Sequence, residues 1–263
     1  WLWFILGAIL LPFSHIQTVF ALAPWLAPIF LLRFLRTQRK AVGMPALYLA
    51  YIVAAWISLR NGFLSPPPGF LLMLAICSGY ALVLSLRYFA DRLVAPRLSG
   101  IARTLVFPLA STVIDWLMIF GPFLTYGSPA YAQYGNLPLM QMVSLTGMWG
   151  LTFLVSWLGP VVNALWEQGF DLRRAWRVIA PFGVTLLAVL LYGSIRLAFF
   201  PPTGQTVLAA GITPDRDLWR YQPVEEIARG SETRREELRA ETGPILDDLF
   251  LRTRQLAQAG VKV

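Results

Sequence analysis

Long apolar runs separated by short polar segments dominate the first two hundred positions of the 263-residue chain. Most of these runs approach the ~20 residues that an α-helix needs to cross the ~30 Å hydrocarbon core of a bilayer. The pattern therefore predicts a bundle of about seven membrane-spanning helices, and we expect further residues before the first run, which is already apolar at its start. The predicted spans are Trp1–Leu11, Val19–Leu35, Pro45–Leu59, Phe70–Leu86, Leu105–Phe120, Leu139–Trp166 and Val178–Phe200.

Composition supports a membrane protein and argues against a nucleic-acid-binding protein. Hydrophobic residues make up 57% of the chain and charged residues 14%, with a mean hydropathy of +0.59, which is unusual for a soluble domain. Residues 1–200 hold 13 Lys and Arg against 4 Asp and Glu, a net charge of +9, whereas residues 201–263 hold 9 against 10, a net of −1. Because the basic excess lies between the apolar runs, the positive-inside rule accounts for it without a nucleic-acid partner.

The basic residues also predict an orientation. They follow every second predicted span, whereas the intervening connections are nearly free of cations, and cytoplasmic connections are the ones that carry excess Lys and Arg. The chain beyond Pro201 is therefore predicted to lie on the extracytoplasmic side. The basic residues are Arg33, Arg36, Arg39 and Lys40 after the second span, Arg87, Arg92, Arg97 and Arg103 after the fourth, and Arg173, Arg174 and Arg177 after the sixth.

After Pro201-Pro202 the chain changes from apolar to mixed and charged. Thr206–Ile212 has the composition of a short strand, and the charged stretch Asp215–Arg254 has apolar residues at helical spacing, with a predicted break at Thr242-Gly243-Pro244. Gly260 is suited to end the helix, and a second strand is predicted from Val261. Strand, helix and strand predict an α/β domain. We therefore divide the chain into a transmembrane domain, 1–200, and the beginning of an extracytoplasmic domain, 201–263.

Asp115 is the only acidic residue inside a predicted span. A charge at membrane depth is costly, so such residues usually face the bundle interior or a polar cavity and mark a substrate path or a partner for another helix. The alternative is a carboxylate near a helix end that pairs with Arg103 or reaches water.

A second candidate region is the uncharged outer loop 125–136, which is rich in tyrosine and amide side chains. Tyr126, Tyr131 and Gln133 could bind lipid headgroups or cover a site, or the tyrosines could serve only as interfacial anchors. Cys77 is the single cysteine, which excludes a disulfide within this chain, and its place inside an apolar run argues against a nucleophilic role. No metal site or cofactor is predicted.

The stretch from Pro108 to Glu167 resembles the membrane domain of apolipoprotein N-acyltransferases. The resemblance rests on FPLASTVIDWL, on the loop containing YAQ, and on NLPLMQMVSLTGMWGLTFLVSWLGPVVNALWE. Residues 206–263, with TVLAAGIT and AQAGVKV, are similar to the opening of the carbon–nitrogen hydrolase domain, an αββα nitrilase-like fold. The family usually has glutamate and a following arginine where this chain has Asp115-Trp116-Leu117, and a Gly-Phe-Pro-Trp-like loop where it has Tyr126-Gly127-Ser128-Pro129. These differences indicate a divergent member.

The resemblance implies an enzyme of the inner cell membrane that works through a Glu–Lys–Cys set in the nitrilase-like domain. The cysteine attacks a phospholipid ester to form a thioester, glutamate acts as general base, and lysine stabilises the oxyanion. The acyl chain then passes to the N-terminal amine of a lipoprotein. The family's glutamate usually follows the strand that begins at Gly260, so we expect the three catalytic residues to lie beyond this chain and the chain itself to be an inactive monomer without a cofactor.

Two other classes of function remain open at this point. A membrane-anchored nitrilase-like amidase would share every feature up to Val263, so nothing in these residues separates it from the acyltransferase. A multi-pass transporter or lipid-binding protein would instead show an internal repeat with paired broken helices, and neither is visible.

Overall fold

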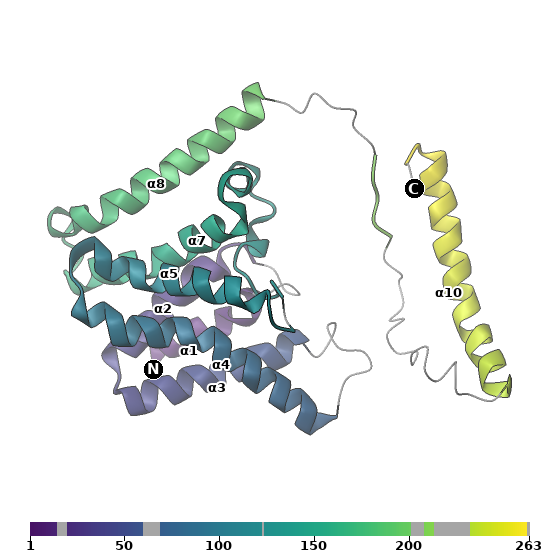
Figure 1. The fold of residues 1–263 in the computed structure, drawn as a ribbon, viewed down its shortest axis with the longest axis horizontal. Coiled ribbons are helices and arrows are strands. Elements are labelled where there is room, and N and C mark those ends of the chain that lie inside the picture. The colour runs from purple at the N-terminus through teal and green to yellow at the C-terminus, as the bar shows by residue number, and fades with distance from the viewer. Residues whose placement is uncertain (15–19, 60–68, 123, 201–207, 213–231, 262–263) are drawn as a thin grey trace. The chain divides into compact units, whose positions relative to one another are not determined.

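The computed structural model describes residues 1–14, 20–59, 69–122, 124–200, 208–212 and 232–261, and every regular element among them is a helix (Figure 1). The chain divides into two compact units, of which the first contains α1 to α8 and the second contains α10. The helices are α1 (Leu2–Leu10), η1 (Pro12–Ser14), α2 (Ala23–Thr37), α3 (Lys40–Leu59), α4 (Phe70–Val94), η2 (Ala95–Arg97), α5 (Gly100–Met118), η3 (Tyr131–Gln133), α6 (Leu137–Met140), α7 (Val143–Glu167), α8 (Leu172–Phe199) and α10 (Glu232–Gln258).

Five helices of the described chain are long and apolar enough to cross a membrane: α3, α4 together with η2, α5, α7 and α8. The 28 residues of α8 correspond to about 42 Å of helix at ~1.5 Å per residue, more than the ~30 Å hydrocarbon core requires. The first unit is therefore a multi-pass helical membrane domain.

The predicted count of seven spans is not confirmed. All seven predicted runs contain helix, but α1 has 9 residues and α2 has 15, fewer than the ~20 that span a bilayer core. The predicted span Leu139–Trp166 is interrupted, because α6 ends at Met140 and Gly147 breaks α7 with a φ of +63°. Glycine tolerates this left-handed conformation because it has no Cβ.

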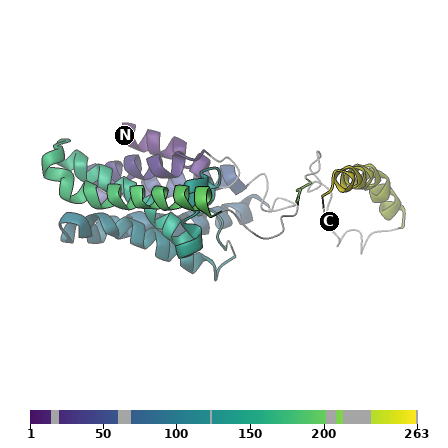
Figure 2. The same cartoon turned by 90° about the horizontal axis from the view of Figure 1, so that it is seen from above.

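Small residues allow the helices of the first unit to pack closely, side by side (Figure 2). A Cβ added to Gly159 of α7 would lie 2.9 Å from the Pro28 side chain of α2, and one added to Gly7 of α1 would lie 2.6 Å from Leu31 of the same helix α2. Membrane helices depend on such close approach, because lipid supplies no hydrophobic drive for their association. Helix α2 is thus held between α1 and α7, although it is too short to qualify as a span.

Helix α8 lies at the edge of the bundle, against α6 and α7 (Figure 1). Only 17% of its most apolar stretch is buried, compared with 39–50% for the other four candidate spans. Its first turn is capped by the Asp171 carboxylate, which accepts hydrogen bonds from the backbone N–H groups of Arg173 (2.9 Å) and Arg174 (3.3 Å). Most of α8 is therefore a surface available to lipid.

An ion-pair network joins four helices at one end of the bundle. Arg36 of α2 contacts Asp91 of α4 at 3.1 Å and Glu167 of α7 at 3.3 Å, and Arg103 of α5 contacts the same glutamate at 2.9 Å. Asp91 is only 2% exposed, so its carboxylate depends on Arg36 for compensation. Arg33, one turn before Arg36, lies with its guanidinium 4.9 Å from the centre of a tryptophan ring in α7.

The second unit shows one predicted feature and corrects two others. Gly260, with a φ of +87°, ends α10: the N–H of Val261 donates to the carbonyl of Leu256 and that of Gly260 to Ala257, both at 3.0 Å, as in a Schellman motif. The predicted break is wrong, since α10 continues through Pro244. No strand forms at 208–212, the described part of the first predicted strand; residues 206–207, 213–231 and 262–263 of the predicted elements lie outside the described residues.

Candidate functional site

Asp115 faces the interior of the bundle, as predicted for a carboxylate at membrane depth. It lies on α5 and is 3% exposed. The Thr152 hydroxyl of α7 donates to Asp115 Oδ2 at 3.2 Å, and the Ser128 hydroxyl, from the loop before α6, lies 2.9 Å from that of Thr152. The alternative pairing with Arg103 is wrong, because Arg103 contacts Glu167 at the end of α7.

Arg87 supplies the opposite charge. It was assigned to a cytoplasmic connection after Leu86, but α4 continues to Val94 and buries the Arg87 side chain, which is 6% exposed. Its Nε donates to the carbonyl of Leu84 at 2.9 Å, and its charge attracts Asp115 across the core without a direct ion pair between these two described residues. Arg87 and Asp115 therefore partly compensate each other in a low-dielectric environment.

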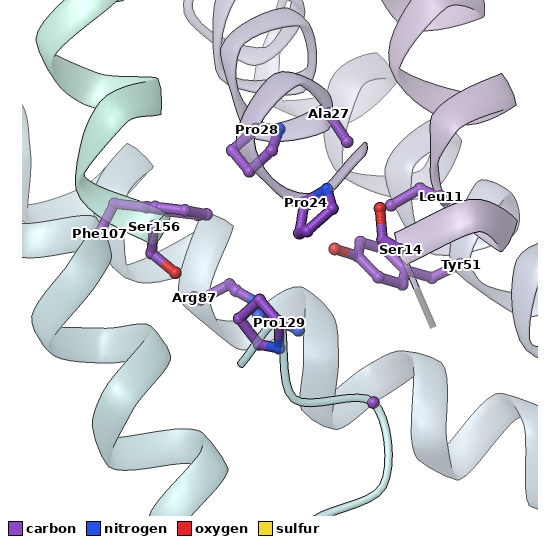
Figure 3. A pocket seen from close by; sticks show the side chains of 11 residues that line it. Leu11, Ser14, Pro24, Ala27, Pro28, Tyr51, Arg87, Phe107, Pro129 and Ser156 are labelled. Carbon is purple, nitrogen blue, oxygen red and sulfur yellow. The ribbon is translucent and has the colours of Figure 1, made fainter. Parts of the chain in front are cut away.

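Arg87 also lines a small cavity of about 30 Å³ within the first unit (Figure 3). The loop residue Pro129 lies beside the arginine, and the hydroxyl groups of Tyr51 and Ser156 turn toward the same space (Figure 3). A cavity of this size with several polar groups is large enough for one or two water molecules. The lining residues are Leu11, Ser14, Pro24, Ala27, Pro28, Tyr51, Arg87, Phe107, Gly127, Pro129 and Ser156.

The three loop candidates occupy different positions. Gln133 is 2% exposed, and its amide donates to the carbonyl of Ala21 at 2.8 Å while accepting from the Trp25 indole at 3.0 Å. Its side chain therefore attaches the loop to the beginning of α2. Tyr131 is 43% exposed, so its ring lies at the surface, and its hydroxyl lies 2.7 Å from that of Thr125.

Tyr126 is partly buried, so its exposure lies between that of Gln133 and that of Tyr131. Its hydroxyl approaches the carbonyl of Ser58 at 3.5 Å, and its own carbonyl accepts from the Tyr80 hydroxyl of α4 at 3.2 Å. Burial raises the pKa of Tyr126 above its ordinary value, because a charged phenolate would be poorly solvated there. The phenol therefore stays neutral near pH 7 and can act only as a hydrogen-bonding group.

The structure brings together some of the candidates and adds residues that the sequence did not single out. Asp115 is linked to the loop through Thr152 and Ser128, but among the described residues no hydrogen bond joins it to Tyr131 or Gln133. Ser128 and Thr152 were overlooked because hydroxyl residues are common in membrane helices and loops. Arg87 could have been identified from its spacing: seven and four residues separate it from the buried Tyr80 and Asp91, which places all three on one helix face.

The cavity can hold water, and hydrogen bonds attach the loop to α2, α4 and α7. Among the described residues no group of three or more His, Cys, Asp or Glu is placed to hold a metal ion. Cys77 is fully buried in α4 and so has no access to a soluble substrate. In the described part of the chain, the site therefore consists of hydrogen-bonding and charged side chains around a small cavity.

Comparison with known proteins identifies relatives of one kind. Residues 7–161 match the family described as apolipoprotein N-acyltransferase N-terminal domain. Proteins named apolipoprotein N-acyltransferase are similar over part of the chain: that of Bradyrhizobium diazoefficiens is 36% identical over 104 residues, that of Rhodopseudomonas palustris 33% over 102, and that of Geobacter metallireducens 36% over 107. Each match covers 38% of this chain and 19% of the relative. No solved structure matches.

Proposed function

Because the chain belongs to the apolipoprotein N-acyltransferase N-terminal domain family, we propose that it is the membrane domain of an enzyme that transfers an acyl chain from a phospholipid to the N-terminal amine of a lipoprotein. The observation that carries the proposal is the family match over residues 7–161, which covers α2 to α5 and most of α7. The alignments with the three relatives, of 102 to 107 residues, cover 19% of each relative, so the activity is proposed by analogy with the complete proteins.

The proposed organisation places residues 1–200 in the inner cell membrane and residues 201–263 at the beginning of an extracytoplasmic nitrilase-like domain. The alternation of basic connections supports this orientation. The reaction would proceed through a cysteine thioester in the nitrilase-like domain, with glutamate as general base and lysine stabilising the oxyanion. None of these three groups is assigned to a residue of this chain, so the chain alone is expected to be inactive.

Within this enzyme the membrane domain would deliver lipid and support the catalytic domain. Tyr131 is the candidate best exposed to a lipid headgroup, since its ring lies at the surface. Tyr126 would meet substrate at the edge of the bundle. Asp115 and Gln133 would contribute by positioning, because both side chains are buried in contacts within the chain.

Acyl transfer can be tested in a bacterial strain depleted of its own apolipoprotein N-acyltransferase. The full gene product containing this chain should restore growth, and mass spectrometry of a lipoprotein should show one additional amide-linked acyl chain at its N-terminal cysteine. A protein that releases ammonia from amides but leaves the lipoprotein amine free would be an amidase, and the proposal would then be wrong.

The inactivity of the chain itself needs a separate experiment. The purified chain is incubated with a phospholipid that carries a labelled acyl group, and peptides are searched for a labelled thioester at Cys77. We expect no label, because Cys77 is fully buried within α4. A labelled thioester that disappears in Cys77→Ala would move the chemistry into the membrane domain.

A further inference from the structure

Arg196 is a cation in the last turn of α8, at the opposite end of that helix from Arg173 and Arg174. Three residues separate it from the end of the helix at Phe199, or about 5 Å along the axis. In a helix that crosses a bilayer, this position lies at the level of the lipid headgroups. If α8 crosses the bilayer in this way, the Arg196 guanidinium lies near the depth of the phosphate groups.

Two hydroxyl groups hold the guanidinium in place. Nη1 of Arg196 donates to Ser144 Oγ of α7 and lies 3.5 Å from the Tyr192 hydroxyl, one turn back on α8. The two hydroxyl oxygens are 3.2 Å apart. Ser144 gives its own proton to the carbonyl of Gln141 at 2.7 Å, so its oxygen is free to accept from the arginine.

The remaining donors of Arg196 are not used within the described chain. A guanidinium has five N–H donors, and both hydroxyl contacts come from Nη1. No carboxylate of a described residue lies within 4.0 Å of Arg196, whereas Arg36 and Arg103 each contact at least one. The remaining N–H donors of Arg196 are thus available to an anionic group from outside the described residues.

The packing of α8 on α6 builds this cluster. Gly193 lies so close to α6 that an added Cβ would overlap the carbonyl group of Pro138. This approach brings the adjacent Tyr192, and Arg196 one turn later, to the beginning of α7, where Ser144 lies. The backbone contact and the hydroxyl contacts are therefore parts of one arrangement.

The surroundings of the cluster distinguish a lipid from a soluble anion. Ile195 is 50% exposed, Phe199 is 74% exposed, and Leu145, next to Ser144, is 66% exposed. A cation in this apolar, outward-facing surface has acyl chains as neighbours. Its counter-ion is therefore expected to carry acyl chains of its own.

We propose that Arg196, Tyr192 and Ser144 form a binding site for the phosphate of a glycerophospholipid, whose acyl chains lie along the exposed apolar face of α8. The Nη2 and Nε donors of Arg196, which no described residue uses, match the two unesterified phosphate oxygens in number and spacing. The identification of this lipid as an acyl donor rests on the proposed function, but its binding does not. The two ideas can therefore fail separately.

Native mass spectrometry of the purified chain in mixed micelles tests the site without any acyl transfer. The probes are dioleoylphosphatidylethanolamine and dioleoylglycerol, which have the same acyl chains but differ in the phosphoethanolamine headgroup. We expect the wild-type chain to prefer the phospholipid, and Arg196→Gln to weaken phospholipid binding on the order of tenfold while leaving dioleoylglycerol binding unchanged. Arg177→Gln, at the other end of α8, is the matched control and should retain wild-type binding.

Several results would overturn the assignment. They are equal binding of the two lipids by the wild-type chain, no effect of Arg196→Gln, an equal loss in Arg177→Gln, or displacement of the phospholipid by an excess of inorganic phosphate. If Arg196→Gln does not give a helical, monodisperse protein, Tyr192→Phe replaces it, since it removes one hydroxyl and keeps the charge. That variant should weaken phospholipid binding by about threefold and leave dioleoylglycerol binding unchanged, and no change would contradict the proposal.

Discussion

The arginines at the two ends of the helical bundle have different kinds of partner. At one end Arg36 and Arg103 contact Asp91 and Glu167, and these contacts join α2, α4, α5 and α7. At the other end Arg196 contacts only hydroxyl groups among the described residues and is surrounded by exposed apolar side chains. The first arrangement compensates charge within the protein, and the second leaves charge for the membrane to compensate.

This difference teaches that an arginine near a membrane surface cannot be interpreted from its position alone. A buried pair loses much of its attraction to desolvation, but removing one partner is costly because the other stays behind uncompensated. A cation without an internal partner costs little at the headgroup level, where phosphate oxygens are available. Substitutions at the two ends should therefore affect different properties, namely stability at the first and lipid binding at the second.

The largest expected effect is on the internally paired end. Asp91→Leu removes the main partner of Arg36 and leaves the guanidinium, with its 9% exposed side chain, beside Glu167 alone. We expect a loss of about 3 kcal/mol in the free energy of unfolding, measured in mixed micelles. Asp171→Asn is the control, because the Asp171 pair with Arg174 is exposed and should contribute less than about 1 kcal/mol. Equal losses in the two variants would contradict the distinction.

A smaller loss in the free energy of unfolding is expected in the middle of the bundle, where the charges of Asp115 and Arg87 compensate each other without a direct ion pair. Asp115→Leu leaves the Thr152 hydroxyl without its acceptor and Arg87 without an opposing charge, so the free energy of unfolding should fall by about 2 kcal/mol. Asp115→Asn keeps an acceptor oxygen and should recover part of that loss. If both variants unfold like the wild-type chain and the full gene product keeps its activity, Asp115 has neither a structural nor a functional role.

Gly193→Ala sharpens the comparison at the other end. The added methyl group would overlap the carbonyl group of Pro138 and push α8 away from α6, at a cost of about 1 to 2 kcal/mol in unfolding free energy. Because the same movement separates Arg196 from Ser144, phospholipid binding should weaken as well. Gly183→Ala, where an added Cβ meets no atom within 4 Å, is the matched control on the same helix. Wild-type binding by Gly193→Ala would show that the hydroxyl cluster does not depend on this packing.

The apolar runs of the sequence predicted where helices form more accurately than they predicted the residues at which the helices begin and end. Apolar runs identify membrane helices because the hydrocarbon core favours apolar side chains and an internally hydrogen-bonded backbone over the whole length of the span. The end of α4 was misplaced because Arg87 was treated as the start of a connection, whereas Arg87 is buried in the bundle and so is Asp91, which pairs with Arg36 of α2. Such tertiary compensation cannot be inferred from the local sequence alone.

The candidate site was predictable to a similar degree. The cost of a charge at membrane depth was sufficient to place Asp115 inside the bundle. Its partners Thr152 and Ser128 come from a different helix and a loop, and their hydroxyls have no distinctive spacing in the sequence. The break predicted at Pro244 did not form: an interior proline removes one backbone hydrogen bond of a helix, yet α10 continues through it.

The smallest expected effect on the protein itself comes from a labelling experiment that determines which end faces outward. Tyr134 is 70% exposed in the loop before α6, and Arg39 is exposed beyond α2, so neither substitution by cysteine should disturb the core. Ser128 would be a poor position despite lying in the same loop, because it is only 3% exposed. The wild-type chain serves as the blank, since its single Cys77 is fully buried.

If the basic connections are cytoplasmic, a membrane-impermeant maleimide should label Tyr134→Cys in intact cells and Arg39→Cys only after lysis. The hydroxyl-held Arg196 would then lie in the outer leaflet, on the side proposed for the nitrilase-like domain, and the ion-pair network would face the cytoplasm. The reverse labelling pattern would place Arg196 in the inner leaflet. The phosphate site could still bind lipid there, but it could not supply an acyl donor to an extracytoplasmic enzyme, so this result would separate the lipid site from the proposed reaction.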